Sequence, residues 1–149
     1  MPTNNKIIDL YDKDAFMWYN ENAKLIREKK FDQIDVLNVA EELESMGRHE
    51  RKILESFLTQ LFMHLLKYLY QTERRSKSWQ ISIKKQRKHA LDHLSESPSL
   101  KGQMPEITSR AYENARIDAA EETGMSLEDF PEEMPFTIEE ALNNNWMPS

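Results

Sequence analysis

Cysteine is absent from the 149-residue sequence, and glycine occurs only three times. Without cysteine the chain has no disulfide, no thiolate metal ligand and no cysteine nucleophile. It also lacks an apolar run of about 18 residues free of charge, and residues 1–14 lack the pattern of a signal peptide. We therefore expect a cytoplasmic protein with neither a membrane span nor a leader.

The length and the apolar content of the chain suit one domain. Apolar residues make up 39% of the sequence. A chain of this size buries roughly two thirds of its unfolded surface around one core. We expect a single all-helical domain over residues 1–149, with residues 1–10 forming a flexible N-terminal segment.

The three glycines fall where helical patterns of apolar residues stop. Gly47, Gly102 and Gly124 are therefore expected at helix C-termini, where glycine tolerates positive φ. No segment alternates with the period of two that strands require. The predicted fold class is all-α, a compact helical bundle of about five main helices with short C-terminal helical turns. The main helices are predicted near residues 12–29, 35–46, 50–70, 78–94 and 105–124, and Ser126 and Thr137 are predicted to begin the short turns.

Helical wheels predict which side of each helix packs. Residues 50–70 carry a stripe too broad for a surface helix, so this helix is expected at the centre of the bundle. The apolar stripe of the preceding helix consists of Val36, Val39, Ala40, Leu43 and Met46. The helix near 78–94 aligns Trp79, Ile83, Gln86, Ala90 and Leu94, and the last main helix is expected to bury Ile107, Ala111, Ala115 and Ala119.

The net charge of −6 is unevenly distributed along the chain. Lysine and arginine number 10 against 12 acidic residues over residues 1–72, 8 against 3 over 73–101, and 2 against 11 over 102–149. The acidic last third suits a basic protein partner better than a phosphate backbone. The residues that we expect to meet such a partner are Asp118, Glu121, Glu122, Glu128, Asp129, Glu132 and Glu133.

The acidic and histidine residues do not form a recognisable metal motif. Di-iron bundles need a Glu-x-x-His pair on each of two helices, and this chain contains none. His89 and His93 have a spacing that zinc can use, but a third ligand is missing from any recognisable position. His64 lies at the edge of a core stripe and is expected to be structural. We predict no metal, no cofactor and no catalytic residue.

A basic segment precedes and enters the helix near 78–94. It contains Arg74, Arg75, Lys77, Lys84, Lys85, Arg87 and Lys88. Basic residues with aromatic neighbours can bind nucleic acid, but Trp79 is on the core side and the lysines 84, 85 and 88 are opposite, which favours a solvated face. Alternatively, the arginines and a buried glutamine could reach acidic residues of the helix near 35–46. The residues of this predicted polar motif network are Asn38, Glu41, Glu42, Glu44, His64, Arg74, Arg75, Trp79 and Gln86.

Two polar motifs, Asn38-Val-Ala-Glu-Glu-Leu-Glu-Ser-Met-Gly47 and Arg74-Arg75-Ser-Lys-Ser-Trp79, carry a family resemblance. Together with Tyr11-Asp-Lys-Asp14 and Phe130-Pro131, they make the chain similar to the bacterial family catalogued as domain of unknown function number 29. The resemblance extends from residue 11 to residue 148. It implies a compact helical fold and implies no activity.

Gly-rich phosphate loops, nucleophile elbows and His-Glu-x-x-His motifs are all missing from the sequence. We therefore favour a non-enzymatic protein that binds another protein, for example an immunity protein or an antitoxin that neutralises a basic toxin. One alternative is a nucleic-acid-binding regulator that uses residues 74–88. Another is a helical hydrolase or metal enzyme built around Glu41, Glu42, His64 and Arg75.

Overall fold

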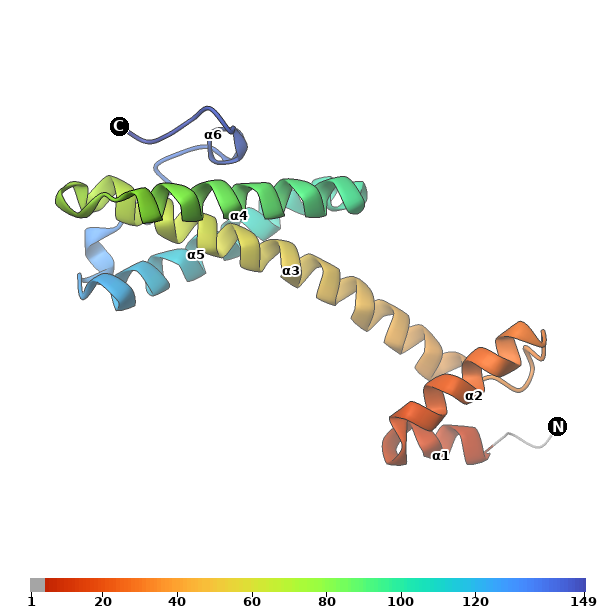
Figure 1. The fold of residues 1–149 in the computed structure, drawn as a ribbon. Helices are drawn as coiled ribbons and strands as arrows, with labels where there is room; N and C mark the ends of the chain where they lie inside the picture. Colours follow the sequence, from red (N-terminus) through yellow and green to blue (C-terminus); the bar gives the residue numbers. More distant parts are fainter. Residues whose placement is uncertain (1–4) are drawn as a thin grey trace. The chain divides into compact units, whose positions relative to one another are not determined.

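The computed structural model describes residues 5–149, and all regular structure among them is helical (Figure 1). This confirms the predicted all-α fold class. The α-helices are α1 (Asn5–Lys13), α2 (Ala15–Arg27), α3 (Val36–Tyr70), α4 (Lys77–Glu96), α5 (Met104–Thr123) and α6 (Ile138–Leu142). Short 3₁₀ turns are η1 (Thr72–Arg74), η2 (Pro98–Gln103) and η3 (Leu127–Asp129). In this part of the chain no helix combines the length and the apolar character needed to cross a membrane.

The chain divides into two compact units, Met1–His49 and Glu50–Ser149. We call them the first unit and the second unit and describe each by itself. The boundary falls inside α3, which continues from one unit into the other. We expected one domain over residues 1–149, and a boundary within a helix leaves no linker signal in the sequence.

Residues 5–10 of the segment that was expected to be flexible belong to helix α1. The helix begins at Asn5, and Ile7 is buried in a small core with Trp18 and Leu25. Leu10 and Tyr11 pack against this core, and their spacing from Ile7 places the three side chains on one side of a helix. Residues 1–4 lie outside the described part of the chain. The first unit therefore uses an amphipathic helix that the sequence reading missed.

Helix α3 is continuous where two helices were predicted. Gly47 does not end a helix, and a Cβ added to it would meet nothing within 4 Å. Glycine inside a helix costs about 1 kcal/mol relative to alanine, which a helix of 35 residues can absorb. Gly124 does behave as predicted, because it has φ of 73° and caps α5 in the left-handed conformation. Gly102 lies within η2.

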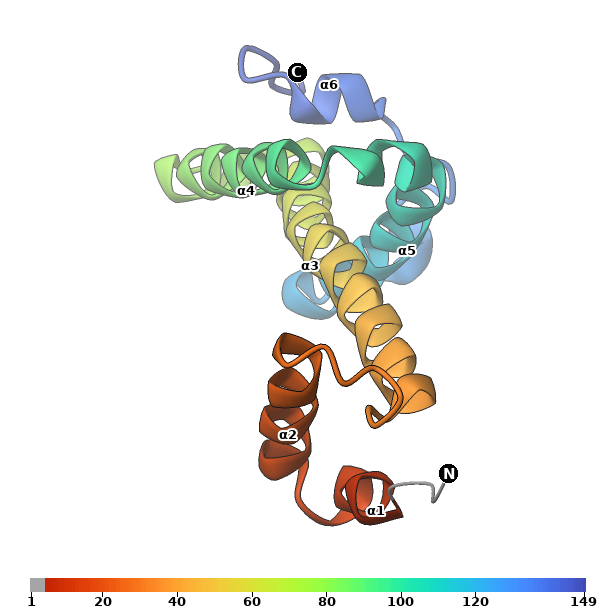
Figure 2. The same cartoon turned by 90° about the vertical axis from the view of Figure 1, so that its right-hand side faces the viewer.

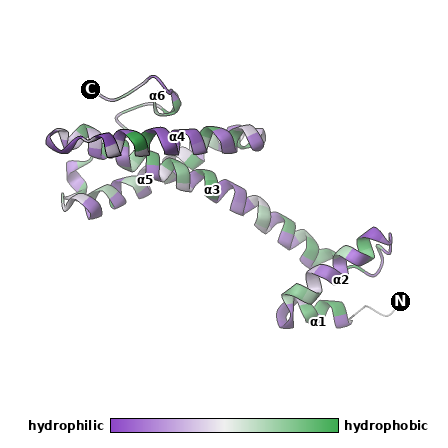
Figure 3. Ribbon diagram, viewed as in Figure 1, coloured by the Kyte–Doolittle hydropathy of each residue, from purple (hydrophilic) through white to green (hydrophobic). Residues whose placement is uncertain are grey.

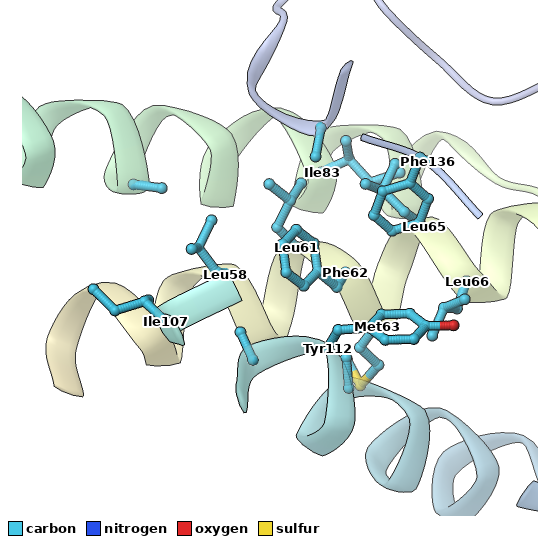
Figure 4. Close-up of a cluster of buried hydrophobic side chains, with 14 of the residues drawn as sticks. Leu58, Leu61, Phe62, Met63, Leu65, Leu66, Ile83, Ile107, Tyr112 and Phe136 are labelled. Atoms are coloured by element: carbon cyan, nitrogen blue, oxygen red, sulfur yellow. The ribbon is translucent and has the colours of Figure 1, made fainter. Parts of the chain in front are cut away.

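The core of the second unit surrounds the second half of α3, as expected for the central helix. Leu58, Leu61 and Phe62 of α3 are fully buried, and Ile83 of α4 and Ile107 of α5 are buried with them (Figure 4). Helices α4 and α5 both pack around this part of α3 (Figure 2). The predicted buried side of α5 is confirmed at Ile107, Ala111, Ala115 and Ala119.

Polar caps begin the helices close to the predicted positions. Asp14 accepts a hydrogen bond from the backbone of Met17 and caps α2. Thr137 forms the predicted capping box at the start of α6. The cap of α4 is Ser76, two residues before the predicted start near residue 78, and its hydroxyl accepts the backbone N–H of Trp79 at 3.3 Å.

Candidate functional site

A buried aspartate organises the polar interior of the first unit. Asp35 precedes α3 and is only 5% exposed. Its carboxylate accepts the indole N–H of Trp18 at 2.9 Å and the side-chain amide of Asn38 at 2.8 Å, and its backbone N–H donates to Asn22 Oδ1 at 2.9 Å. These bonds fix the start of α3 against α2. Sequence reading selected Asn38 and missed Asp35, although a buried tryptophan needs an acceptor for its N–H.

Glu42, which also belongs to α3, accepts hydrogen bonds from two tyrosines of α1 and α2. Tyr11 donates to Glu42 Oε1 at 2.8 Å, and Tyr19 donates to Glu42 Oε2 at 3.3 Å. The hydrogen bond to this carboxylate raises the pKa of Tyr11 to about 12. Glu41 pairs with Arg48 at 3.1 Å. Two acidic residues of the predicted polar network therefore take partners within the first unit.

Arg75, in the second motif, binds main-chain carbonyls of the second unit. Its Nε donates to the carbonyl of Tyr68 at 2.7 Å and its Nη2 donates to the carbonyl of Ser149 at 3.1 Å. The guanidinium also lies 4.2 Å from the centre of the Tyr68 ring. Trp79 is half-buried, with the Lys67 ammonium 4.9 Å from its ring centre. The two motifs thus take different partners, each within its own unit, and a direct link between them stays a prediction.

Other members of the predicted network are less constrained. Arg74 and Glu44 are exposed, and Gln86 is half-buried. Within the described residues, none of these three side chains makes a hydrogen bond or an ion pair. His64 is half-buried, and its Nδ1 is buried with no hydrogen-bond partner in the same part of the chain. Burial, followed by the charge of Lys67, lowers the pKa of His64.

Arg87 is the buried cation of the second unit, and sequence reading assigned it to the solvated basic segment. It is 2% exposed, and burial lowers its pKa. Its Nε donates to the carbonyl of Ala141 at 2.7 Å and its Nη2 to the carbonyl of Trp146 at 3.0 Å. A signal was available, because Arg87 has helical spacing from the buried residues Ile83 and Ala90.

The histidines of α4 pack against α3. His93 is buried, and its Nε2 lies 2.9 Å from the backbone carbonyl of Glu50. The His89 ring lies 5.1 Å from the Phe57 ring. These residues line a shallow cavity with Ile53, next to the end of α4. In residues 5–149, no group of three or more His, Asp or Glu side chains is placed to hold a metal ion.

The predicted apolar stripe of residues 36–46 is exposed, although such a stripe was expected to face a core. Val36 is 58% exposed, Leu43 63% and Met46 64%, and Ala40 is also exposed. Only Val39 packs against the small core of the first unit. Ten of the fifteen exposed large hydrophobic side chains in the described residues belong to the first unit: Ile8, Phe16, Met17, Tyr19, Ile26, Phe31, Val36, Leu37, Leu43 and Met46. Figure 3 shows that hydrophobic and hydrophilic residues alternate along α3.

Val36, Ala40, Leu43 and Met46 follow one another at intervals of three or four residues, so they lie along one side of α3 within the first unit. All four residues are exposed. We define these four residues as the open stripe. It is the candidate functional site.

A comparison with protein-family models decides the family. The model described as "Domain of unknown function DUF29" matches residues 10–147. The chain belongs to the DUF29 family. This confirms the resemblance stated from the two motifs. Comparison with curated proteins and with solved structures gave no match.

The acidic residues expected at a partner interface lie at the surface of this DUF29 protein, but several of them form ion pairs or hydrogen bonds within the chain. Glu122 pairs with Lys67 at 2.9 Å. Asp129 accepts the backbone N–H of Ser126 at 2.9 Å, and Glu128 accepts the Ser126 hydroxyl. Glu121, Glu132 and Glu133 are exposed, and Asp118 is half-buried.

The basic segment of the DUF29 chain exposes fewer cations than its sequence contains. Lys77, Lys84, Lys85 and Lys88 are exposed on α4. Arg87 is buried, Arg75 is bound to carbonyls, and Lys88 pairs with Asp92 at 2.7 Å. The surface therefore consists of four lysines and Arg74, and no nucleic-acid site is assigned to it.

Proposed function

We propose that this DUF29 protein is a binding module for another protein and that the open stripe of α3 is its contact surface. The observation that carries the proposal is the exposure of Val36, Leu43 and Met46, three large apolar side chains along one side of α3 in the first unit. Contiguous exposed apolar residues bordered by polar ones are typical of interaction sites.

The energetics of the first unit support this proposal. Its core contains only Ile7, Trp18 and Leu25 as buried hydrophobic residues in the described part of the chain. Units of about 50 residues bury too little surface to be strongly stable, and this chain has no cysteine for a disulfide. Covering a large apolar side chain contributes about 1.5–3 kcal/mol. A partner on the open stripe would thus stabilise the unit that needs it.

The finer form of the proposal is an immunity protein or antitoxin that neutralises a basic toxin in the bacterial cytoplasm. The net charge of −6 and the exposed Glu121, Glu132 and Glu133 support it. Such charges would speed association with a cationic partner rather than add much affinity. Reversing these three charges should lower the association rate about tenfold at low salt. An unchanged rate would remove the acidic surface from the proposal.

Site-specific photo-cross-linking in the native host tests the proposed function. A photoreactive amino acid replaces Leu43 in the open stripe or, as a matched control, Ser45, which is also exposed but lies on the opposite side of α3. We expect one protein to be cross-linked at position 43 and not at position 45. Equal labelling at both positions, or no adduct at position 43, would contradict the proposal.

A further inference from the structure

A cavity of about 430 Å³ lies in the second unit between α5 and the segment that follows η3. Thr108, Tyr112 and Arg116 line it from α5, and their spacing of four residues places them on one side of that helix. Glu132 and Met134 line it from the segment after η3. Ligand pockets in proteins have volumes of about 300–1,000 Å³. The cavity is therefore large enough for a small organic molecule.

Hydrogen bonds tie the two sides of this cavity to each other. The hydroxyl of Tyr112, a residue only 6% exposed, donates to the carbonyl of Pro131. Arg116 Nη2 donates to the carbonyl of Phe130 at 3.0 Å and to that of Leu127 at 3.3 Å. The segment after η3 is thus fixed against α5 before any ligand binds. A preformed site reduces the entropy that binding costs.

The lining of the cavity contains buried polar atoms that have no partner. Three such side-chain atoms occur in residues 5–149, and two of them, Thr108 Oγ1 and Arg116 Nε, belong to residues that line this cavity. Buried polar atoms without a partner are rare in native proteins, and a ligand or an ordered water is a common explanation. Among the same residues, Arg116 forms no ion pair, and its Nη1 donates to no acceptor and is not one of the buried atoms. The guanidinium therefore offers a donor to an anionic group.

The acidic lining limits what that anionic group can belong to. Glu113 of α5 and Glu132 are exposed, and neither forms an ion pair within the described part of the chain. A phosphate or a dicarboxylate would bring further negative charge close to these two carboxylates, which opposes binding. A ligand with one carboxylate and one ammonium group has a counter-charge for each sign in the lining. Met134 adds an apolar surface for a side chain of that ligand.

We propose that this cavity binds a free α-amino acid with an apolar side chain. The ligand's carboxylate accepts a hydrogen bond from Arg116 Nη1, and Glu113 and Glu132 supply carboxylates for its ammonium group. Its side chain lies against Met134. The site shares no residue with the open stripe, so it adds a small-molecule ligand to the protein-binding role proposed above.

Isothermal titration calorimetry of the full-length chain with free amino acids tests this inference. The probes are L-leucine, L-methionine and L-valine. The probe that binds most tightly is then compared with its N-acetyl derivative, which lacks the ammonium, with its amide, which lacks the carboxylate, and with inorganic phosphate. We expect a Kd below about 1 mM for at least one amino acid. Each blocked derivative should bind at least about tenfold more weakly, because it loses one charge-assisted contact, and phosphate should not bind.

A variant of Glu113 locates the binding. Glu113→Gln should weaken the tightest amino acid about fivefold, because a carboxylate near the ammonium becomes neutral. Glu121→Gln is the matched control, since Glu121 is also an exposed glutamate of α5 and does not line the cavity. It should change the affinity by less than about twofold. Circular dichroism verifies that both variants keep the helical fold.

Four results overturn the inference. They are absence of binding of all three amino acids up to about 10 mM, equal affinity of the free amino acid and its blocked derivatives, tighter binding of phosphate than of any amino acid, and equal effects of Glu113→Gln and Glu121→Gln. None of them bears on the cross-link expected at position 43, because that position belongs to the first unit. The inference and the proposed function can therefore fail separately.

Discussion

Replacing Arg87 with methionine should loosen the C-terminal segment of the second unit. Methionine retains an unbranched apolar stem of similar length and removes every donor. The carbonyls of Ala141 and Trp146 then lose the guanidinium that binds them at 2.7 and 3.0 Å. Segment 138–146 is thereby detached from α4 at two points.

The expected loss of stability follows from the burial of Arg87 and from its two hydrogen bonds. A hydrogen bond from a charged donor contributes about 1.5–3 kcal/mol, so two of them contribute about 3–6 kcal/mol. Removing a guanidinium that is 2% exposed also recovers part of the cost of burying its charge. We expect Arg87→Met to lower the free energy of unfolding of the second unit by about 3 kcal/mol. Lys88→Met is the matched control, since Lys88 is exposed and its surface ion pair contributes about 0–1 kcal/mol.

Urea unfolding followed by circular dichroism measures both losses, and hydrogen exchange locates them. Backbone amides of α6 should exchange faster in Arg87→Met than in Lys88→Met. A loss below about 1 kcal/mol for Arg87→Met, equal to that of the control, would show that the buried arginine does not hold this segment.

Three further predictions concern other positions. Gly47→Ala should raise the free energy of unfolding by about 0.5–1 kcal/mol, because Gly47 lies inside a helix and an added Cβ would meet nothing within 4 Å. Gly124→Ala should lower the free energy of unfolding by about 1–2 kcal/mol, because Gly124 has φ of 73°. Thermal unfolding measures both changes, and two changes of the same sign would refute the reasoning. Asp35→Ala should destabilise the first unit by about 2–3 kcal/mol by leaving the indole N–H without its acceptor, seen as a red shift of tryptophan fluorescence. The lowered pKa of His64 means that the unfolded chain binds a proton below about pH 6.5 before the folded chain does, so this residue makes stability fall as pH is lowered. His64→Gln should reduce the loss of stability between about pH 7.5 and 5.5, and an unchanged loss would contradict this reasoning.

Local sequence signals were sufficient for the helical fold. The spacing of Ile107, Ala111, Ala115 and Ala119 correctly predicted the buried side of α5, and Gly124 correctly predicted its end. These features depend on side-chain periodicity and on backbone conformation, which act over a few residues. The family resemblance was also confirmed, because the family model matches residues 10–147.

The continuity of α3 could not be read in the same way. Gly47 resembles a helix end in sequence, but a single glycine in a long helix is a small cost that neighbouring turns outweigh. The exposure of Leu43 and Met46 was also beyond sequence reading, because an amphipathic pattern shows that a side is apolar and does not show what covers it.

The polar contacts within the two units were partly predictable from the sequence. Sequence reading selected Glu42 and Arg75, but it did not select Tyr11, Asp35 or Arg87 as organising residues. Their partners are 17 to 59 residues away in the chain, so that spacing along one helix says nothing about them. A long-range hydrogen bond depends on tertiary packing, which the local pattern does not contain.

Calorimetric titration of the protein cross-linked at position 43 tests the central claim, that the open stripe binds another protein. The purified partner is titrated into the full-length chain, Leu43→Asp and Ser45→Asp. A charge placed in a buried apolar contact should cost at least about 3 kcal/mol, so we predict an affinity loss of about 100-fold or more for Leu43→Asp. Ser45→Asp should change the affinity by less than about twofold. Equal affinities of all three chains would contradict the claim that this stripe is the contact surface.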